Sequence, residues 1–264
     1  MRFSVTLGAG GSGRDPGGLA ALAGLAEDAG WDAFFLEDYL CYRELPTYDA
    51  WVCLAAIAAA TTRIRIGTTV TPLPRRQPWE LAAQAVAVDH LSGGRLILGV
   101  GSGAGDDPAL AAVGPPMSVP ERAARLDEGL QVLTALWTGT RVVHHGRYYQ
   151  LDGLRLAAVP VQRPRIPIWI GGELGRRGVR RRLAQWDGAC PYRERALDPA
   201  DVHDILGLIR AAGREPAGYD IKVSGNPGLL GEFAAAGATW WGQWIPPGDV
   251  DEAREVIAAG PPRL

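Results

Sequence analysis

The chain is poor in the residues that build metal centres and disulfide frameworks. Its 264 residues include only three cysteines and four histidines. An odd number of thiols cannot all pair within one chain, and Cys41, Cys53 and Cys190 do not follow a metal-ligand spacing. We therefore expect reduced thiols and a cytoplasmic protein. His144 and His145 are adjacent, but no third ligand stands at a suitable spacing, so we expect no metal site.

The chain also lacks a charge excess and a long apolar run. Its 27 basic and 29 acidic residues give a formal net charge of −2, which predicts no binding to nucleic acid or to an anionic membrane. No apolar run is long enough to span a bilayer, and the first expected strand begins almost at Met1, with no basic and apolar leader before it. With 47% apolar residues, the composition is typical of a compact, soluble enzyme.

What is present is a strand, helix, strand unit at residues 63–105. Two segments of strand character, 64–70 and 96–100, are separated by a segment whose apolar residues recur at helical spacing. A connection of this length joins parallel neighbours, and its right-handed crossover places both strand ends on the same side of the sheet. Both strands end in small or hydroxylated residues, among them Thr69, Gly101, Ser102 and Gly103. Two turns of bare backbone are therefore expected to face the same space.

Eight strand segments alternate with helices along the chain, which predicts a (β/α)8 TIM barrel. The expected strands are 2–7, 32–36, 64–70, 96–100, 165–172, 187–190, 220–224 and 237–247. We expect one domain over residues 1–264, with a hairpin-containing insertion around residues 104–160. Within the insertion, residues 104–120 are expected to form a loop and Gly146 to lie at the hairpin turn.

An acidic pair, Glu37 and Asp38, ends the second expected strand. Side chains at the carboxyl ends of barrel strands face the active site, so this pair is the candidate catalytic pair, with a helix cap and a surface carboxylate as the alternative. A third bare turn, Gly171 and Gly172 with Glu173 next to it, ends the strand at 165–172. Glycine removes the Cβ obstacle and leaves backbone amides free to point at an anion.

Two groups of arginines lie near these strand ends. Arg75 and Arg76 follow the third strand, and five more arginines lie in a basic helix that begins at Arg176. Both groups carry guanidinium ions of the kind that bind phosphates. Solvated arginines on the protein surface are the alternative interpretation.

Two other function classes are disfavoured by the sequence. Gly99, Gly101 and Ala104 match a G-x-G-x-x-A dinucleotide fingerprint after a strand. The residues that follow are too few and too rich in proline for the phosphate-facing helix of that fingerprint, which argues against a nicotinamide-binding doubly wound fold. A cofactor-free hydrolase is disfavoured because the sequence has no G-x-S-x-G element and no metal cluster.

Six blocks of sequence, in order, carry a resemblance to a known family. The longest is GTTVTPLPRRQPWELAAQAVAVDHLSGGRLILGVGSG. The others are DAGWDAFFLEDYL before it, and RLDEGLQVLTALWTG, HHGRYYQLDGLRL, RPRIPIWIGG and GATWWGQWIPPGD after it. Together they resemble the luciferase-like monooxygenase family, whose members are flavin- or deazaflavin-dependent eight-stranded barrels. The resemblance covers most of the chain.

This resemblance implies an oxidoreductase whose cofactor supplies the redox chemistry. The first expectation is monooxygenation of a small organic substrate with dioxygen and reduced FMN, the latter supplied by a separate flavin reductase. The alternative is hydride transfer with the deazaflavin coenzyme F420, and a non-catalytic flavin-binding protein is a third possibility. The family resemblance also implies a homodimer.

The resemblance further implies which residues hold the cofactor. A cis peptide bond between Thr69 and Val70 would support the face of the ring, with an ordinary trans strand end as the alternative. The turns around Ser102 and Gly171 would bind the cofactor phosphate. The full set of expected cofactor-binding residues is Thr69, Val70, Gly101, Ser102, Gly103, Gly171, Gly172 and Glu173.

The chain departs from part of the family at two positions. Sugar-phosphate dehydrogenases of the deazaflavin branch carry Asp-His at the end of the second strand and a Glu after the second glycine turn. Here Asp38 stands in place of the His and Ala104 in place of the Glu. These changes argue against a sugar-phosphate substrate and against a histidine base at this strand.

Overall fold

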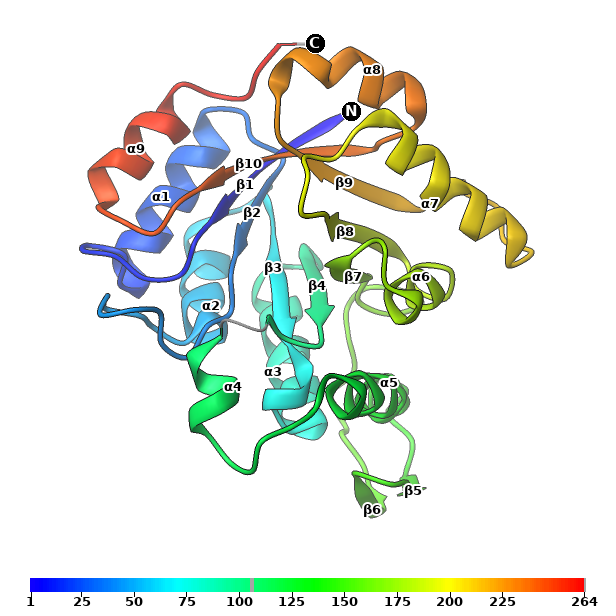
Figure 1. Cartoon of the computed structure of the whole chain (residues 1–264). Helices are drawn as coiled ribbons and strands as arrows, with labels where there is room; N and C mark the ends of the chain where they lie inside the picture. Colours follow the sequence, from blue (N-terminus) through cyan, green and yellow to red (C-terminus); the bar gives the residue numbers. More distant parts are fainter. Residues whose placement is uncertain (105–106, 264) are drawn as a thin grey trace.

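The computed structural model describes residues 1–104 and 107–263 (Figure 1). Eight parallel strands close into a barrel in the order β1-β10-β9-β8-β7-β4-β3-β2, which confirms the predicted (β/α)8 TIM barrel. The barrel strands are β1 (Arg2–Leu7), β2 (Ala33–Leu36), β3 (Arg65–Pro72), β4 (Leu96–Gly101), β7 (Ile168–Glu173), β8 (Gly188–Tyr192), β9 (Asp220–Ser224) and β10 (Trp240–Ile245). The strands expected at 2–7 and 220–224 have the predicted bounds, and the others agree within a few residues.

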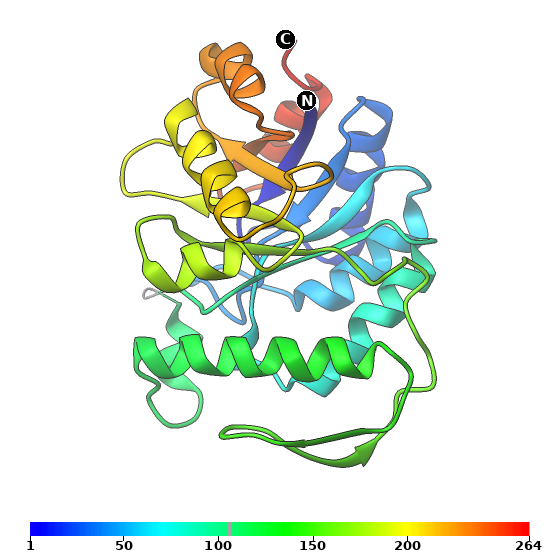
Figure 2. The ribbon, with the colours of Figure 1, turned by 90° about the vertical axis from the view of Figure 1, so that its right-hand side faces the viewer.

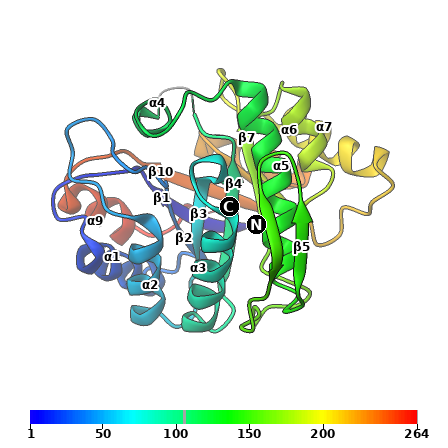
Figure 3. The same cartoon turned by 90° about the horizontal axis from the view of Figure 1, so that it is seen from below.

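Helices cover the outside of the barrel, and those next to each other in sequence mostly pack side by side around the ring of strands (Figure 3). They are α1 (Pro16–Asp28), α2 (Ala50–Ala60), α3 (Pro78–Leu91), α4 (Pro108–Ala112), α5 (Val119–Leu136), α6 (Arg177–Leu183), α7 (Pro199–Ala211), α8 (Leu230–Ala236) and α9 (Val250–Ala258), with short 3-10 helices at Leu73–Arg75 and Pro227–Leu229. Side-chain caps fix several of their starts: Asp15, Asp49 and Ser118 each accept a hydrogen bond from the first turn that follows. Across the described residues, none of the helices has the length and apolarity needed to cross a membrane.

The prediction of a loop at residues 104–120 is wrong in one part. Asp107 caps the short helix α4, and Pro108 occupies its first position, where a missing amide hydrogen has little consequence. Proline is compatible with a helix start, so the prolines around this segment did not exclude a helix. Residues 105 and 106 of the expected loop lie outside the described residues.

The chain between β4 and β7 adds α4, α5 and the antiparallel hairpin of β5 (Val142–His145) and β6 (Gln150–Leu154). Figure 2 shows the hairpin beneath the long helix α5. Glu128 of α5 holds it there, since its carboxylate accepts hydrogen bonds from the backbone amides of Tyr148 at 3.0 Å and Tyr149 at 2.8 Å. His144 also hydrogen-bonds Glu128, through Nε2 at 3.2 Å. This histidine therefore serves the attachment of the hairpin.

The barrel interior contains its own apolar cluster, which we call the lower layer. It is separate from the larger core between strands and helices. Its buried members are Ala33, Phe35, Ile97, Trp169 and Trp240. The rings of Phe35, Trp169 and Trp240 contact one another, with centroids 5.5 Å apart for the two pairs that include Trp169. The lower layer fills the barrel with aromatic side chains.

Candidate functional site

A cavity of about 380 Å³ lies at the carboxyl ends of the barrel strands, within the size range of small-molecule sites. All ten residues predicted for catalysis or cofactor binding line it. They are Glu37 and Asp38 from the end of β2, Thr69 and Val70 from β3, Gly101, Ser102 and Gly103 from the end of β4, and Gly171, Gly172 and Glu173 from β7. Four strand ends far apart in sequence therefore meet on one rim.

The barrel interior changes composition between the lower layer and the next inward-facing position of each strand, which lies nearer to the cavity. Side chains on a strand alternate, so the inward position after each lower-layer residue lies two residues later. After Phe35, Ile97, Trp169 and Trp240 these positions are Glu37, Gly99, Gly171 and Gly242. We call this set the upper layer. Three of its four members have no side chain, so side chains from other positions can enter the space above the aromatic rings.

Val70 occupies part of this space. The Thr69–Val70 peptide bond is cis, as the family resemblance implied, and the pairing of β3 with β4 shifts register between Thr68 and Thr71. A Cβ added at Gly101 would lie 2.8 Å from Val70 Cγ2, and one at Gly171 would lie 2.5 Å from Val70 Cγ1. The two glycines are thus required by the Val70 side chain, a reason within the protein that the sequence did not reveal.

The other two predicted glycines also have packing reasons. Gly172 has a φ of +145°, and a Cβ there would lie 2.7 Å from Val179 Cγ2. Gly103 has a φ of +86°, and a Cβ there would collide with Leu110 of α4. Positive φ values of this kind favour glycine, and its use leaves the backbone of both turns bare toward the cavity.

Asp38 is buried at the cavity wall and is fully engaged by hydrogen-bond donors. Its carboxylate accepts hydrogen bonds from Thr71 Oγ1 at 2.8 Å, from Arg75 Nη2 at 2.7 Å and from Arg76 at 2.8 and 3.0 Å. The interpretation of the two arginines as solvated surface residues is therefore wrong. Their guanidinium groups pair with acidic side chains of the protein.

The same arginines connect Asp38 to two helix caps. Arg75 also pairs with Asp107, the cap of α4, at 3.0 Å, and Arg76 with Asp49, the cap of α2, at 3.1 Å. Although burial opposes it, the carboxylates of Asp38 and Asp49 raise the pKa of Arg76 above its ordinary value. This ionic cluster fixes the end of β2 against the starts of two helices.

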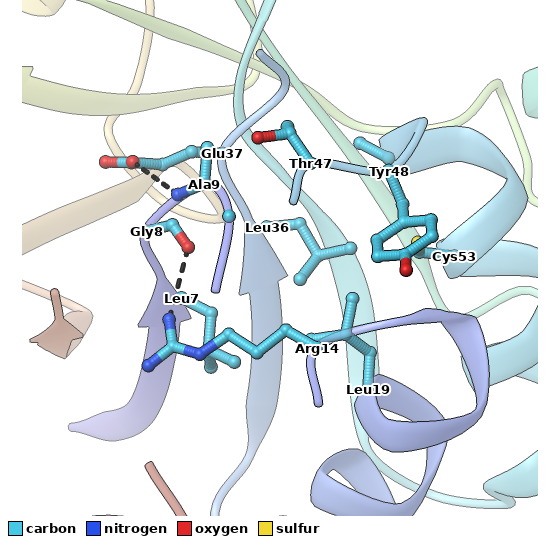
Figure 4. Close-up of a pocket in the computed structure, with 12 residues that line it drawn as sticks. Leu7, Gly8, Ala9, Arg14, Leu19, Leu36, Glu37, Thr47, Tyr48 and Cys53 are labelled. Carbon is cyan, nitrogen blue, oxygen red and sulfur yellow. Dashed lines mark hydrogen bonds between the residues drawn. The ribbon is translucent and has the colours of Figure 1, made fainter. Parts of the chain in front are cut away.

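Glu37 lies between the main cavity and a smaller one of about 30 Å³, which has room for one or two water molecules (Figure 4). One oxygen of its carboxylate accepts a hydrogen bond from Trp244 Nε1 at 3.0 Å and the other from the backbone amide of Ala9 at 3.2 Å. In the smaller cavity, the buried Arg14 donates to the carbonyl oxygen of Gly8 at 3.3 Å. Glu37 is therefore held in a fixed orientation at the cavity wall.

The model of the family described as luciferase-like monooxygenase matches residues 1–228. The chain belongs to this family. An F420-dependent glucose-6-phosphate dehydrogenase of Nakamurella multipartita is 36% identical over 163 residues, which cover 59% of this chain and 46% of that protein. The chain thus matches about half the length of this relative.

Two solved structures of luciferase-like barrels have the same fold. The F420-dependent tetrahydromethanopterin reductase of Methanopyrus kandleri has a TM-score of 0.78 at 18% identity, with 97% of each chain covered. The monooxygenase RslO1 of Streptomyces bottropensis has a TM-score of 0.79 at 21% identity, with 97% of this chain and 96% of that chain covered. At these identities the likeness establishes the fold alone.

Arg122 is a lining residue of this luciferase-like barrel that the sequence did not single out. It lies in the first turn of α5, and its Nε is buried without a hydrogen-bond partner among the described residues. A cation in a first helical turn is unfavourable next to the positive end of the helix dipole. This unfavourable position was the one feature of the sequence that could have pointed to Arg122. An unsatisfied guanidinium beside the cavity fits an anionic group of a ligand.

The basic helix α6 contributes to the cavity mainly through its start. Arg176 lines the cavity and pairs with Glu173 at 2.7 Å. Arg182 is buried and pairs with Asp127 of α5 at 2.6 Å. Of the predicted cluster, Arg176 is thus placed to meet a ligand, while Arg182 attaches α6 to α5.

Cys190 of β8 also lines the cavity. Burial raises the pKa of its thiol to about 12, against the opposing charge of Lys222. The thiol is therefore protonated near neutral pH. Within residues 1–104 and 107–263, no three His, Cys, Asp or Glu side chains are arranged to hold a metal ion.

Proposed function

We propose that this protein is an F420-dependent oxidoreductase that transfers hydride between the deazaflavin and a small organic substrate. The observation that carries the proposal is the single cavity in which Val70, the bare turns of β4 and β7, and the unpaired Arg122 meet. Val70 and the bare turns suit a flat ring, and Arg122 suits an anionic group. The choice of F420 is supported by the dehydrogenase relative of Nakamurella multipartita.

An FMN-dependent monooxygenase is the second candidate. The order expected from the sequence is the reverse, with this enzyme first and the F420-dependent enzyme second. The structural likeness to RslO1 favours it, although this likeness concerns the fold. Such an enzyme would receive reduced FMN from a separate reductase. The two candidates differ in whether dioxygen is consumed.

The bound cofactor would supply the hydride acceptor, and residues of the chain would position it and move a proton. Val70 would support the ring, and the amides of the Ser102 and Gly172 turns, with Arg122, would hold the phosphate and the acidic tail. Glu37 would exchange a proton with the substrate, since Trp244 and Ala9 hold its carboxylate at the cavity wall.

The substrate we propose is not a sugar phosphate. Asp38 stands where related dehydrogenases carry a histidine, and its carboxylate is occupied by two guanidinium groups and Thr71. It is therefore not available as a proton acceptor, and Ala104, which also lines the cavity, supplies no acid.

A paired titration with F420 and with FMN tests the proposal. We expect F420 to bind with a dissociation constant in the micromolar range, about 8 kcal/mol, and FMN to bind more weakly. The measurement is quenching of cofactor fluorescence. Tighter binding of FMN, with dioxygen consumption in the presence of reduced FMN, would favour the second candidate. Binding of neither cofactor would refute both.

Substitution of the two adjacent carboxylates separates their roles. Glu37→Gln should lower kcat by about 10²- to 10⁴-fold without changing the melting temperature, because the variant loses proton transfer but keeps the fold.

Asp38→Asn should cost about 3 kcal/mol of unfolding free energy, because it leaves two buried guanidinium groups poorly compensated. Turnover with F420 and denaturant unfolding measure the two effects. An Asp38→Asn protein of unchanged stability would contradict the assignment.

A further inference from the structure

Lys222 is the only lysine in the sequence, in which all other basic residues are arginine. It lies in the middle of β9, and its neighbours Ile221 and Val223 face the outer core. Alternation along the strand therefore directs Lys222 into the barrel. The residue is 8% exposed.

The side chain of Lys222 extends across β10 at the boundary between the lower and upper layers. A Cβ added at Gly242 would lie 2.6 Å from both Cε and Nζ of Lys222, and 3.1 Å from Ser4 Oγ of β1. The ammonium lies 5.9 Å from the centroid of the Phe35 ring. The absence of a side chain at Gly242 thus gives the lysine its space directly above the aromatic rings.

No side chain among the described residues forms an ion pair or a hydrogen bond with this ammonium. Its titratable neighbours are Cys190 of β8 and Glu37 of β2, both of which line the cavity. Arg2 of β1 and Asp220 of β9 pair with each other at the amino ends of the strands. Burial lowers the pKa of Lys222, against the opposing effect of Cys190 and Glu37. A buried charge without a partner is costly, so a purely structural role does not explain it.

We propose that Lys222 is a positioning residue whose ammonium, beneath the cavity floor, favours negative charge on the redox ring bound above it. This inference rests on the proposed function. In hydride transfer a C–H bond of the organic substrate breaks, and its electron pair and hydrogen form a new C–H bond on the ring. The substrate would be oxidised and would release its second hydrogen as a proton to a carboxylate of the protein. Reduction would add one negative charge to the neutral ring, and the ammonium would stabilise that charge.

The variant Lys222→Met tests this, since methionine has a similar length and no charge. We expect the dissociation constant of reduced F420 to rise at least tenfold and that of oxidised F420 to change less than twofold. For a two-electron couple, a change of at least fivefold in the ratio of the two constants lowers the midpoint potential of the bound cofactor by about 20 mV or more. The melting temperature of the cofactor-free protein should stay the same or rise. Ile221→Met, on the same strand but facing the outer core, is the matched control and should leave the ratio of the two constants unchanged.

A single lysine also allows a direct measurement on the wild type. Protein labelled with 13C at lysine Cε gives one lysine signal, whose pH titration reports Lys222 alone. We expect a midpoint below the ordinary lysine value in the free protein and an upward shift with reduced F420, because an anion above favours the charged form. Oxidised F420 should cause a smaller shift.

The outcomes separate the two proposals. The role of Lys222 is refuted, and the proposed function stands, if F420 binds but Lys222→Met weakens the binding of its oxidised and reduced forms equally. The same holds if the lysine signal does not respond to reduction of the bound F420. If neither cofactor binds the wild-type protein, the proposed function fails and the inference fails with it.

Discussion

The two layers inside the barrel belong to the same strands, two residues apart, and yet serve opposite purposes. In the lower layer, Phe35, Trp169 and Trp240 fill the interior completely. In the upper layer, Gly171 and Gly242 leave space that the side chains of Val70 and Lys222 enter. The difference shows how one sheet combines a stable core with a binding site. Large side chains at one end give stability, and missing side chains at the other end give space.

The largest effect expected from this comparison is on the stability of the lower layer. Trp169→Ala should cost about 3 to 5 kcal/mol of unfolding free energy, because it leaves a cavity beside Phe35 and Trp240 that the surrounding strands cannot move in to fill. Denaturant unfolding measures it. The control is Trp244→Ala, since Trp244 is 48% exposed and should cost far less. Equal losses for both tryptophans would show that the lower layer is not the stabilising one.

The next effect concerns the upper layer and should fall mainly on binding. Gly171→Ala places a methyl group 2.5 Å from Val70 Cγ1, so Val70 must move into the cavity. We expect a stability cost of about 1 to 3 kcal/mol from overpacking and at least a tenfold loss of F420 affinity. Gly207→Ala is the matched control. Nothing lies within 4 Å of its added Cβ, and in the helix α7 it should stabilise by about 0.5 to 1 kcal/mol.

The smallest effect concerns the amino ends of the strands, on the closed side of the barrel. Glu27 accepts hydrogen bonds from the backbone amides of Thr62, Arg63 and Ile64, just before β3. Although burial opposes them, these bonds lower the pKa of Glu27 to about 2. Because the folded pKa lies below the unfolded value, the stabilisation is complete above about pH 4.5 and is lost as the pH falls toward about 2.

Glu27→Gln should therefore lower the unfolding free energy at pH 7 by about 1 to 2 kcal/mol, allowing for partial exposure of the group. Between pH 4.5 and 2 the variant should also lose stability less steeply than the wild type. Urea unfolding at a series of pH values measures both. Parallel curves for the two proteins in that range would contradict the role of Glu27.

Much of this architecture could be predicted from the sequence because it depends on periodic features. Strand segments and helices alternate along the chain, and parallel strands bring their carboxyl ends to one rim. The positions of Gly101, Gly171 and Glu37 around one cavity follow from that rule alone. The cis bond at Thr69–Val70 was implied by family resemblance, since no local pattern encodes it.

Charge pairing could not be predicted in the same way. Asp38 meets Arg75 and Arg76 across more than thirty residues of sequence, and only the folded chain determines which carboxylate reaches which guanidinium. Arg122 and Lys222 were overlooked for a related reason. Each occurs in an ordinary helix or strand segment, and their lack of a partner is a property of the three-dimensional surroundings.

The aromatic lower layer closes the cavity toward the amino ends of the strands, so the cavity has a deep end and a rim. Whatever lies deepest must enter first and leave last. If the redox cofactor lies on Val70, the substrate follows it in and the product departs ahead of it, so turnover has a compulsory order. Such a cofactor would then not need to leave between turnovers, while smaller reactants would exchange at the rim.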